Sequence, residues 1–374
     1  MMTHLENHNI LTDRQHGFRS GHSCESQLII TAQDLLSSAD RGSRVDMAIL
    51  DFSKAFDTVP HARLMAKLNF YGIRGNVHGW IKQFLRNRTQ RVVIDGFSSS
   101  KISVDSGVPQ GTVLGPILFL IFIIDLPSQI KSKCRLFADD CLVYNEIFDL
   151  SDSLQLQQDL ANLEVWAKTW GMEFNAQKCY ILSTEKGGRP YFYQLNGHIL
   201  KAVPTSSYLG VLFSEDLSFS PHIANTVKKS SRILGFLQRN LKGCPPRLKE
   251  LAYFTLVRSS LEYSSTVWDP FLQKDIDALE RIQRRAARFT QGHYIRPWKM
   301  NQPILRETLT VPWQSLQSRR KNARVTLLYK AVNGLVALPT SDILCKADAR
   351  TRGGQNNFKH IKTDKRPSRI LFSP

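Results

Sequence analysis

The sequence predicts an α+β fold, and its charge predicts two unequal parts. Short apolar runs typical of strands are interspersed with helical segments in the first part, whereas the chain from about Ser218 onward is predicted to be helical. Residues 1–150 carry a net charge of +1, and residues 151–374 carry +17. Such a basic region favours a polyanionic partner, and a merely soluble basic surface is the alternative. We expect boundaries that separate residues 1–213, 214–300 and 301–374, the last a basic helical extension with a loosely ordered tail.

The mixed part begins with a capped helix and a buried strand. Residues 23–40 start at Ser23 and continue with helical apolar spacing, which predicts an N-capped helix. The apolar run over residues 44–53 predicts a buried strand. Two more helices are predicted over residues 61–72, where a glycine ends the pattern, and over residues 76–88.

A hairpin and a buried helix come next. The segments TQRVVIDG and SKISVDSG have the pattern of two paired strands. They are followed by GTVLGPILFLIFIIDL, whose longest apolar run covers residues 116–126. That run is shorter than the about 20 residues that a bilayer span needs, so it predicts a buried helix.

A second hairpin carries two adjacent acids. The segment KCRLFADDCLVYNE has two apolar arms around Ala-Asp-Asp, which predicts a hairpin with Asp139 and Asp140 at its turn. Residues 151–171 are amphipathic, and we expect a helix capped by Ser151 and ended by Gly171. Short strand-like pieces then lead to the helical part, and the six tryptophans, mostly at apolar helical spacing, are expected in cores.

Cysteine usage and the N-terminus argue against several classes of protein. The six cysteines form no CxxC motif and no Cys/His cluster, so neither a zinc knuckle nor a disulfide framework is expected. The first ten residues lack the apolar core of a signal peptide. We therefore expect an intracellular protein of the nucleus or cytoplasm, neither secreted nor held in a membrane.

Three carboxylates are expected at one end of the predicted sheet. Asp51 follows the apolar run of one strand, while Asp139 and Asp140 lie at the turn of the hairpin. Gathering three carboxylates without a cation raises at least one pKa, and a pair of Mg²⁺ ions relieves the repulsion because Mg²⁺ prefers hard oxygen ligands. Two such ions can support phosphoryl transfer. The alternative is an ordinary turn pair and a helix N-cap, where aspartate is common.

The order of motifs around these acids resembles that of reverse transcriptases, in wording closest to the non-LTR (LINE-type) retrotransposons of the jockey and CR1 kind. In chain order the matching segments are DRQHGFRSGHSCESQL (fingers), AILDFSKAFDTVPH (motif A), SGVPQGTVLGPILF (motif B), FADD (motif C), FNAQKC (motif D) and SYLGVLF (before the thumb). Residues 261–289 are similar to the C-terminal region of these elements. The resemblance covers nearly the whole chain. It implies a right-hand polymerase palm with partial fingers, followed by an all-α basic thumb and the C-terminal extension.

The resemblance also implies roles for the acids and one lysine. Asp51, Asp139 and the main-chain carbonyl of Phe52 would hold two Mg²⁺ ions, with Mn²⁺ as the alternative, and Asp140 would be a weaker or outer ligand. Lys178 is similar to the motif D lysine that protonates the leaving pyrophosphate, and an ordinary surface lysine is the alternative.

Five residues are implied to contact the incoming nucleotide. Phe56 takes the place of the bulky side chain that excludes a ribose 2′-OH, although a core aromatic at a helix start is the alternative. Pro109, Gln110 and Gly111 would lie against the nucleotide, where Gly111 permits close approach of the backbone, and a Pro-Gly turn is compatible with this. Arg19 would contact the template or the triphosphate.

Two arginine-rich helices are expected to bind nucleic acid. Their basic residues are Arg281, Arg284, Arg285 and Arg288 on one helical face, and Arg319, Arg320, Lys321 and Arg324 further on. Arginine suits bidentate phosphate contact, and four arginines without an acid among them repel one another unless a polyanion is bound. A solvated charged face is the alternative.

The resemblance implies an RNA-directed DNA polymerase that uses an RNA template, a DNA primer and deoxynucleoside triphosphates. The family's upstream finger segment with its triphosphate-gripping arginine and its endonuclease are expected to lie outside this chain, which we therefore expect to be the C-terminal part of a longer protein or a truncated copy. The alternative function is a catalytically silent relic that binds RNA or DNA through its basic half.

Overall fold

The computed structural model describes residues 1–184, 191–292 and 313–340, and the chain forms two compact units. The first unit contains Met1–Gln27 and Ser37–Leu209, and the second contains Leu28–Leu36 and the chain from Gly210 onward. Most of the predicted C-terminal extension, including its loose tail, lies outside the described residues.

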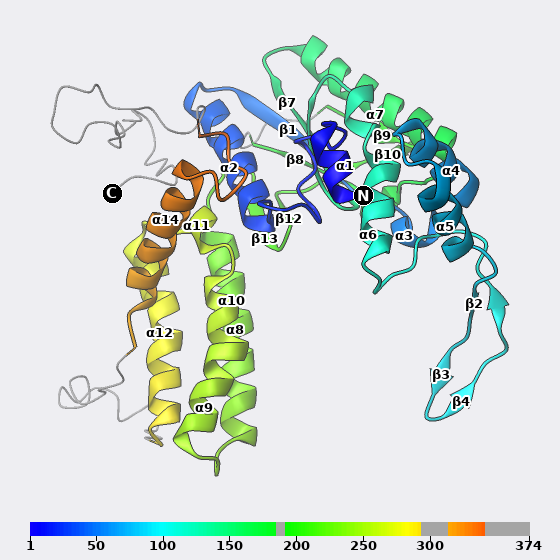
Figure 1. The fold of residues 1–374 in the computed structure, drawn as a ribbon. Coiled ribbons are helices and arrows are strands. Elements are labelled where there is room, and N and C mark those ends of the chain that lie inside the picture. The colour runs from blue at the N-terminus through cyan, green and yellow to red at the C-terminus, as the bar shows by residue number, and fades with distance from the viewer. Residues whose placement is uncertain (185–190, 293–312, 341–374) are drawn as a thin grey trace. The chain divides into compact units, whose positions relative to one another are not determined.

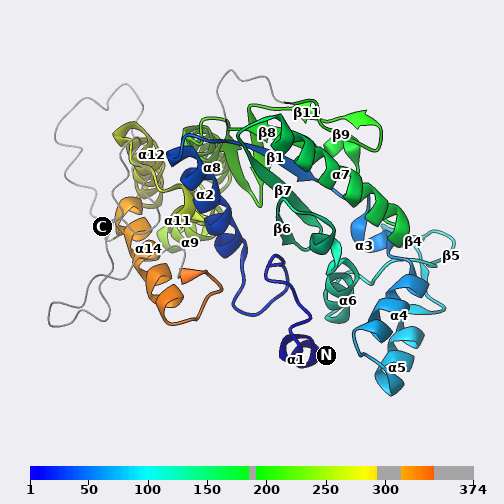
Figure 2. The ribbon, with the colours of Figure 1, turned by 90° about the horizontal axis from the view of Figure 1, so that it is seen from above.

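A five-stranded sheet forms the centre of the first unit (Figure 2). Its strands, in spatial order, are β11 (Lys201–Ala202), β8 (Tyr180–Ser183), β1 (Arg44–Leu50), β7 (Asp140–Ile147) and β6 (Lys133–Phe137). The central strand β1 pairs antiparallel with β7 and with β8, and only β11 is parallel to its neighbour. The expected α+β class is confirmed, and the strand predicted over residues 44–53 is confirmed over Arg44–Leu50.

Helices cover one face of this sheet. Ala48 and Leu50 of β1 and Val143 of β7 belong to one buried cluster with the apolar residues of α6 (Leu114–Ile123) and α7 (Leu150–Trp170). Alternate residues of β1 such as Met47 are also buried, so the strand is covered on both faces and reads as a continuous apolar run. The predicted buried helix is confirmed.

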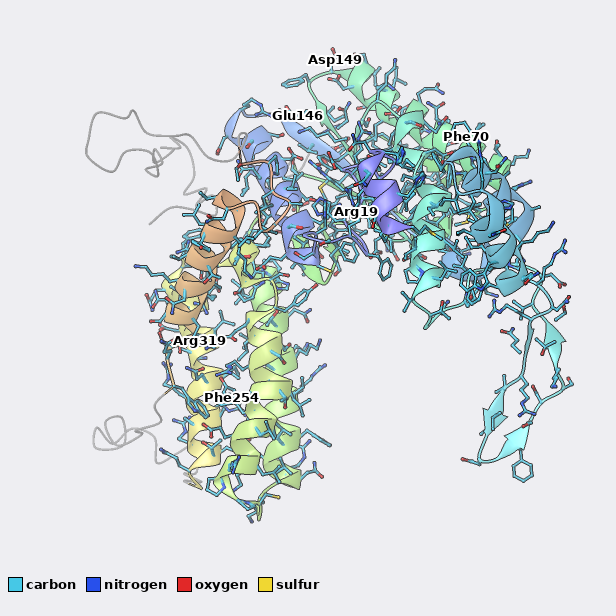
Figure 3. All side chains as sticks on the ribbon, viewed as in Figure 1. Arg19, Phe70, Glu146, Asp149, Phe254 and Arg319 are labelled. Carbon is cyan, nitrogen blue, oxygen red and sulfur yellow. The ribbon has the colours of Figure 1, made fainter. Side chains whose placement is uncertain are left out.

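The helices of the first unit follow their local signals closely. They are α1 (Met2–Asn7), α2 (Cys24–Asp40), α3 (Ala55–Thr58), α4 (His61–Phe70) and α5 (Gly75–Leu85), with 3₁₀ turns at Leu126–Gln129 and Ala176–Lys178. The Ser23 hydroxyl accepts a hydrogen bond from the Ser26 amide and caps α2, as expected. The cap of α7 was predicted wrongly, because Asp149 caps the helix and accepts from the amide of Ser151 (Figure 3).

Short strands complete this part of the chain. A long arm follows α5, in which β2 (Thr89–Gln90) pairs with β5 (Ile102–Ser103) and β3 (Val93–Ile94) pairs with β4 (Phe97–Ser98) (Figure 1). The remaining strands are β9 (Gln194–Leu195), β10 (His198–Ile199), β12 (Thr205–Tyr208) and β13 (Val211–Ser214). The arm confirms the predicted first hairpin, and β6 with β7 confirms the second.

Beyond β13 the described part of the second unit is helical (Figure 1). Its helices are α8 (Ser220–Asn240), α9 (Pro246–Ala252), the π-helix Tyr253–Arg258, α10 (Ser259–Glu262), α11 (Ser265–Trp268), α12 (Gln273–Thr290) and α14 (Leu316–Val332). The apolar stripe of α12, which includes Leu279, Ile282 and Ala286, is buried. Within the described ranges no helix is long and apolar enough to cross a membrane.

Candidate active site

The sheet brings the three predicted carboxylates to one end. Asp51 follows the last residue of β1, and Asp140 is the first residue of β7. The antiparallel register pairs Leu50 with Cys141, which places Asp51 beside Asp140 across the two central strands. Asp139 lies in the turn between β6 and β7, next to both.

The pKa values of Asp139 and Asp140 are raised by burial and by the neighbouring acids. Burial, followed by the charges of Asp139 and Asp51, raises the pKa of Asp140 to about 6. Burial and the charge of Asp51 also raise the pKa of Asp139. Asp140 is exposed to solvent, and the two neighbouring carboxylates add to the effect of burial on its ionisation. A bound cation would reverse this repulsion by favouring the ionised form of each acid.

The donor atoms at this end of the sheet suit a hard divalent cation. They are carboxylate oxygens and main-chain oxygens, which Mg²⁺ prefers, and Mg²⁺ is commonly held by one or two carboxylates together with substrate phosphates. Within residues 1–184, 191–292 and 313–340, no three histidine, cysteine, aspartate or glutamate side chains are arranged to hold a metal ion together. The kinds of donor atom at this end of the sheet therefore fit the cation, whereas the acids of the described residues are not grouped as a complete site of three ligands.

The turn that carries Asp139 is held by a residue that the sequence patterns missed. Ala138 adopts a left-handed conformation with φ of 53°, which is strained for a residue with a side chain. The buried Gln15 side chain clamps it: Gln15 Oε1 accepts from the Ala138 amide at 2.9 Å, and Gln15 Nε2 donates to the Ala138 carbonyl at 3.3 Å. Oε1 also accepts from the Gly17 amide at 2.7 Å. We call this arrangement the Gln15 clamp.

The backbone around Gln15 reinforces the clamp. The Leu136 amide donates to the Arg14 carbonyl, and the His16 amide donates to the Leu136 carbonyl, so this segment lies along the edge of β6. Gly17 packs so closely that a Cβ atom there would lie 2.4 Å from the Ala138 nitrogen. The segment QHGF was the available signal, but no local pattern links it to a turn 123 residues away.

A second close pairing supports Asp51. The Asn175 amide donates to the Asp51 carbonyl and the Ser53 amide donates to the Glu173 carbonyl, both at 2.8 Å, around a bridge between Phe52 and Phe174. These two bonds leave the Phe52 carbonyl out of the pairing, which keeps it available as an oxygen donor.

The predicted proton donor lies beside the same acid. Lys178 Nζ is 3.7 Å from Asp51 Oδ2, and the lysine side chain is 68% exposed. The segment that resembles motif D is therefore brought to the carboxylates with its ammonium group open to solvent.

The segment SGVPQG is hydrogen-bonded to the helix that follows Asp51. The Val108 amide donates to the Phe56 carbonyl, the Gly107 amide donates to the Val59 carbonyl, and Gln110 Nε2 donates to Asp57 Oδ1 at 3.1 Å. Gly107 has φ of 86°, and a Cβ atom there would lie 2.7 Å from the Asp57 carbonyl oxygen. Motif B is thus tied to motif A by main-chain contacts that only a glycine allows.

The other residues predicted to contact the nucleotide differ in how far they are buried. Phe56 is partly buried and stacks on Phe119, with ring centroids 4.3 Å apart, so it is a packed aromatic, and its contact with the nucleotide stays a prediction. Pro109 is buried, whereas Gly111 is exposed.

Arg19 differs from its predicted role. Its Nη1 atom donates to the main-chain carbonyls of Thr12 at 2.7 Å and Gln15 at 3.3 Å, and lies 3.6 Å from Asp13 (Figure 3). The guanidinium therefore hydrogen-bonds to the loop that carries Gln15. This placement favours a role in holding that loop over contact with a nucleotide.

Comparison with known proteins identifies the family. Residues 1–236 match the family described as reverse transcriptase (RNA-dependent DNA polymerase). The chain belongs to the reverse transcriptase family. The three acids, the motif B segment and the Gln15 clamp all lie within the matched residues of this reverse transcriptase domain.

Individual relatives come from mobile elements. The chain is 28% identical over 370 residues to the RNA-directed DNA polymerase from mobile element jockey of Drosophila melanogaster, which covers 94% of this chain and 39% of that protein. It is 28% identical over 301 residues to a probable RNA-directed DNA polymerase from transposon BS of the same fly, covering 75% of this chain and 32% of that protein. The chain thus spans about a third of the length of these curated relatives.

Among solved structures, the chain is similar to that of apo telomerase from Candida tropicalis. It aligns with a TM-score of 0.42 at 11% identity and covers 91% of this chain and 59% of the telomerase chain.

The four predicted basic residues of α12 differ in exposure, and their contact with nucleic acid stays a prediction. Arg281 and Arg284 are exposed, and Arg285 and Arg288 are half-buried. Arg285 Nη1 donates to Ser231 Oγ of α8 at 2.7 Å. Burial and the charges of Arg284 and Arg285 lower the pKa of Arg288, which shows the mutual repulsion of these arginines.

The ion pairs of α14 correct the prediction that its arginines contact phosphate. Arg320 is 1% exposed and its Nε atom lies 2.6 Å from Asp269 Oδ1. Arg324 Nε lies 3.4 Å from the other oxygen of the same carboxylate, and Arg319 forms a two-pronged contact with Glu262. These arginines hold α14 to its own unit, so the prediction of phosphate contact is wrong for Arg320 and loses its basis for the other two.

Lys321 is the exposed member of this second group. Its ammonium carries the accessible charge where the three arginines beside it are engaged with acids. The expected phosphate contact of this helix therefore rests on Lys321.

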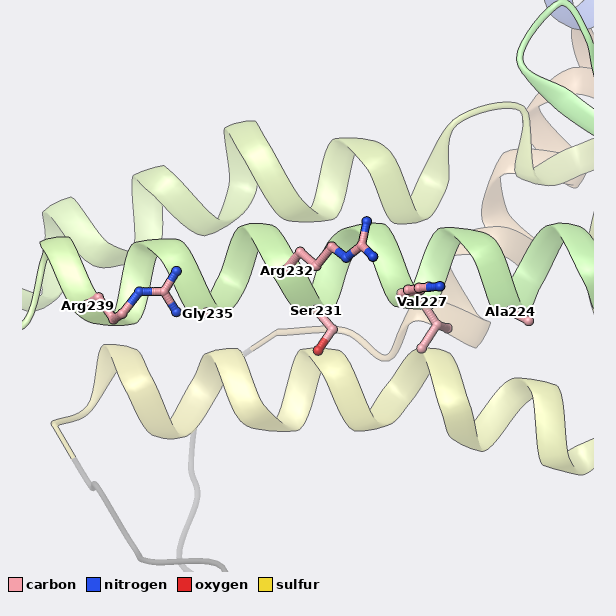
Figure 4. A pocket seen from close by; sticks show the side chains of 7 residues that line it. Ala224, Val227, Ser231, Arg232, Gly235 and Arg239 are labelled. Atoms are coloured by element: carbon pink, nitrogen blue, oxygen red, sulfur yellow. The ribbon is translucent and has the colours of Figure 1, made fainter.

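A basic hollow that the sequence did not predict lies along α8 (Figure 4). Its volume is about 530 Å³, and it is lined by Ala224, Val227, Lys228, Ser231, Arg232, Gly235 and Arg239. Of these lining residues, Lys228, Arg232 and Arg239 supply positive charge at solvent-exposed positions.

Proposed function

We propose that this chain is the catalytic part of an RNA-directed DNA polymerase, which extends a DNA primer along an RNA template. The meeting of Asp51 with Asp139 and Asp140 at one end of the sheet, inside a reverse transcriptase domain, is the observation that carries the proposal. The primer 3′-oxygen attacks the α-phosphate of a deoxynucleoside triphosphate, and pyrophosphate leaves.

The acids prepare the site for charge. Asp51, Asp139, Asp140 and the Phe52 carbonyl would hold two Mg²⁺ ions, with Mn²⁺ as the alternative. When bound, the ions supply Lewis-acid stabilisation of the attacking and leaving oxygens. The Gln15 clamp holds the turn before Asp139 in its left-handed conformation, which would keep the Asp139 oxygens at this end of the sheet while the ions and substrate bind.

Other side chains act on the nucleotide. Lys178, exposed and beside Asp51, is placed to donate a proton to the departing pyrophosphate. Phe56, fixed by its stack on Phe119, would crowd a ribose 2′-OH and favour deoxynucleotides. Gln110, whose side chain donates a hydrogen bond to Asp57, would contact the nucleotide or its template base, and Gly111 beside it has open space.

We propose that the helices within residues 214–300, which belong to the second unit, are the thumb of the polymerase. The hollow along α8, with the exposed Arg281 and Arg284 of α12, offers positive charge to the backbone of a template–primer duplex. Such contacts position a duplex without reading its sequence. They release counterions, so binding is expected to weaken steeply as salt rises.

The test is extension of a DNA primer on an RNA template in the presence of Mg²⁺. The native chain is compared with Asp139→Asn and with Asp105→Asn, the same change at an exposed acid on the arm side of motif B. Asp139→Asn is expected to lower incorporation by about 10³-fold or more, because metal-assisted stabilisation is the largest contribution to this chemistry. Equal incorporation by Asp139→Asn and the native chain would remove the metal-site assignment.

RNA binding measured in the same samples separates the alternative function. A native chain that binds RNA but incorporates no nucleotide with Mg²⁺ would be a nucleic-acid-binding relic. A chain that does neither would overturn both functions.

A further inference from the structure

The first unit carries a basic surface of its own on α5 and on the arm formed by β2 to β5. We call it the arm surface. Residues 74–105 contain six lysines and arginines and two aspartates, whereas the other residues of 1–150 contain ten basic and thirteen acidic residues. The near-neutral charge of the first part of the chain therefore hides a concentration of positive charge on this surface.

The positive charges of the arm surface are not neutralised internally. Its basic residues are Arg74, Lys82, Arg86, Arg88, Arg91 and Lys101. None of them forms an ion pair with a residue of the described ranges, and all but the half-buried Arg88 are exposed. This differs from α14, where buried and half-buried arginines are engaged with acids. Six unpaired cations with few acids between them favour a polyanionic partner.

The same surface exposes aromatic and branched apolar side chains. Trp80 is 56% exposed and stacks on Phe84 with ring centroids 5.7 Å apart and planes 16° from parallel. Phe97 at the arm's β4 is 83% exposed, and Val93 and Ile94 of β3 are open to solvent. The expectation that the tryptophans lie in cores is thus wrong for Trp80. Burying these groups is favourable only with a partner that also matches the cations.

This combination fits a single strand better than a duplex or a protein core. Ring faces open to solvent can stack on bases, but the bases of a duplex are already stacked on one another. A protein partner with a purely apolar contact would leave the six cations desolvated and unpaired, which is costly. Arginine and aromatic side chains together are the usual elements of single-strand recognition.

We propose that the arm surface binds single-stranded RNA, namely the part of the template that is not paired with the primer. The choice of RNA rests on the proposed polymerase function. Single-strand recognition itself rests on the exposed aromatic side chains and unpaired cations of α5 and the arm.

The experiment measures binding of the full chain to a single-stranded RNA oligonucleotide and to an RNA duplex, without Mg²⁺ or nucleotides. One variant combines Trp80→Ala with Phe97→Ala, and its matched control is Phe148→Ala, a 72% exposed aromatic elsewhere in the first unit. Because each stacked base contributes substantially, the double variant is expected to bind single-stranded RNA at least about tenfold more weakly. Duplex binding and the control are expected to match the native chain.

A charge variant gives an independent readout. Arg91→Gln combined with Lys101→Gln is expected to reduce the slope of log affinity against log salt for single-stranded RNA by about 1.4, because each phosphate contact adds about 0.7. Lys131→Gln, which changes an exposed lysine outside the arm surface, is expected to leave that slope unchanged.

Three results would overturn the proposal: native affinity in the double variant, an equal loss toward duplex RNA, or loss of self-association in a sedimentation experiment without loss of RNA binding. Thermal unfolding of each variant shows that the fold is kept, as the high exposure of Trp80 and Phe97 leads us to expect. Failure of primer extension by the native chain would remove the polymerase function and leave these binding results standing. Normal extension with unaltered binding by the double variant would remove the arm surface alone.

Discussion

Replacement of Gln15 tests how the catalytic turn is held. Gln15→Met keeps the length of the side chain and removes its polar atoms. Two amides, those of Ala138 and Gly17, lose their acceptor, and the Ala138 carbonyl loses a donor. Gln15 is 2% exposed and Ala138 is 5% exposed, so water cannot easily replace these bonds. An unsatisfied buried group costs about 1–3 kcal/mol, and with partial relaxation we expect the free energy of unfolding to fall by about 2–4 kcal/mol.

Gln15→Glu separates the two ends of the clamp. A glutamate keeps an acceptor for both amides but turns an oxygen toward the Ala138 carbonyl and adds a charge near Asp139. Burial and that neighbouring charge raise the pKa of the new carboxyl in the folded state, so the ionised form is the destabilising one. Its destabilisation is expected to be large at pH 8 and to shrink as the pH falls toward 5, where the folded state takes up the proton.

The assay is urea unfolding of the native, Met and Glu chains, together with primer extension. In these variants Ala138 is expected to leave its left-handed conformation. The acids would then be misplaced while the nucleotide contacts remain, so kcat is expected to fall by about 10- to 100-fold with a smaller change in KM. A Met variant whose free energy of unfolding stays within about 0.5 kcal/mol of native would refute the clamp. So would a Glu variant whose stability has no pH dependence beyond that of the native chain.

Three other contacts give predictions of stability. Lys67 is buried over the Trp170 ring and 2.6 Å from Asp125, so Lys67→Met leaves an unpaired acid and is expected to lower the free energy of urea unfolding by about 3 kcal/mol. Gly107→Ala places a Cβ against a main-chain oxygen at positive φ and is expected to cost about 3 kcal/mol in the same assay, against about 1 kcal/mol for Gly96→Ala, which has similar φ and open space. Burial lowers the pKa of His222 to about 4, so as the pH falls this histidine is protonated in the unfolded chain before it is protonated in the folded chain. Urea unfolding measured at a series of pH values is therefore expected to show the free energy of unfolding falling between pH 6.5 and 4. His222→Gln removes the titrating group and is expected to abolish that fall. Native-like unfolding of the Lys67 variant, equal costs at the two glycines, or an unchanged pH profile in the Gln variant would contradict the respective prediction.

Local patterns were sufficient for most of the framework. The strand before Asp51, the hairpin around Asp139 and the buried helix between them follow from the spacing of apolar residues, which a strand or helix imposes on its own sequence. The cap of α7 was missed by two residues because both Asp149 and Ser151 are good capping residues, and only the entry of the preceding chain decides between them.

Arginines show where local patterns stop. The run around Arg320 has no acid beside it in the sequence, yet its partner Asp269 lies 51 residues earlier and is brought next to it by packing of α14 on its own unit. Arg281 and Arg284, of the same residue type and similar spacing, stay exposed. The sequence gives the number and spacing of the arginines. Whether an arginine is exposed or paired with an acid depends on which face of its helix is covered by other elements.

By itself, the sequence determined the order of strands and helices, the place of the three acids at strand ends and the excess of positive charge, because each of these depends on residues that are close in the chain. The tertiary structure alone decided that Gln15 clamps a turn 123 residues away, and that the cations of the arm surface are unpaired while Arg320 is buried. Hydrogen bonds and burial between distant residues depend on strand register and helix packing, which periodicity does not encode.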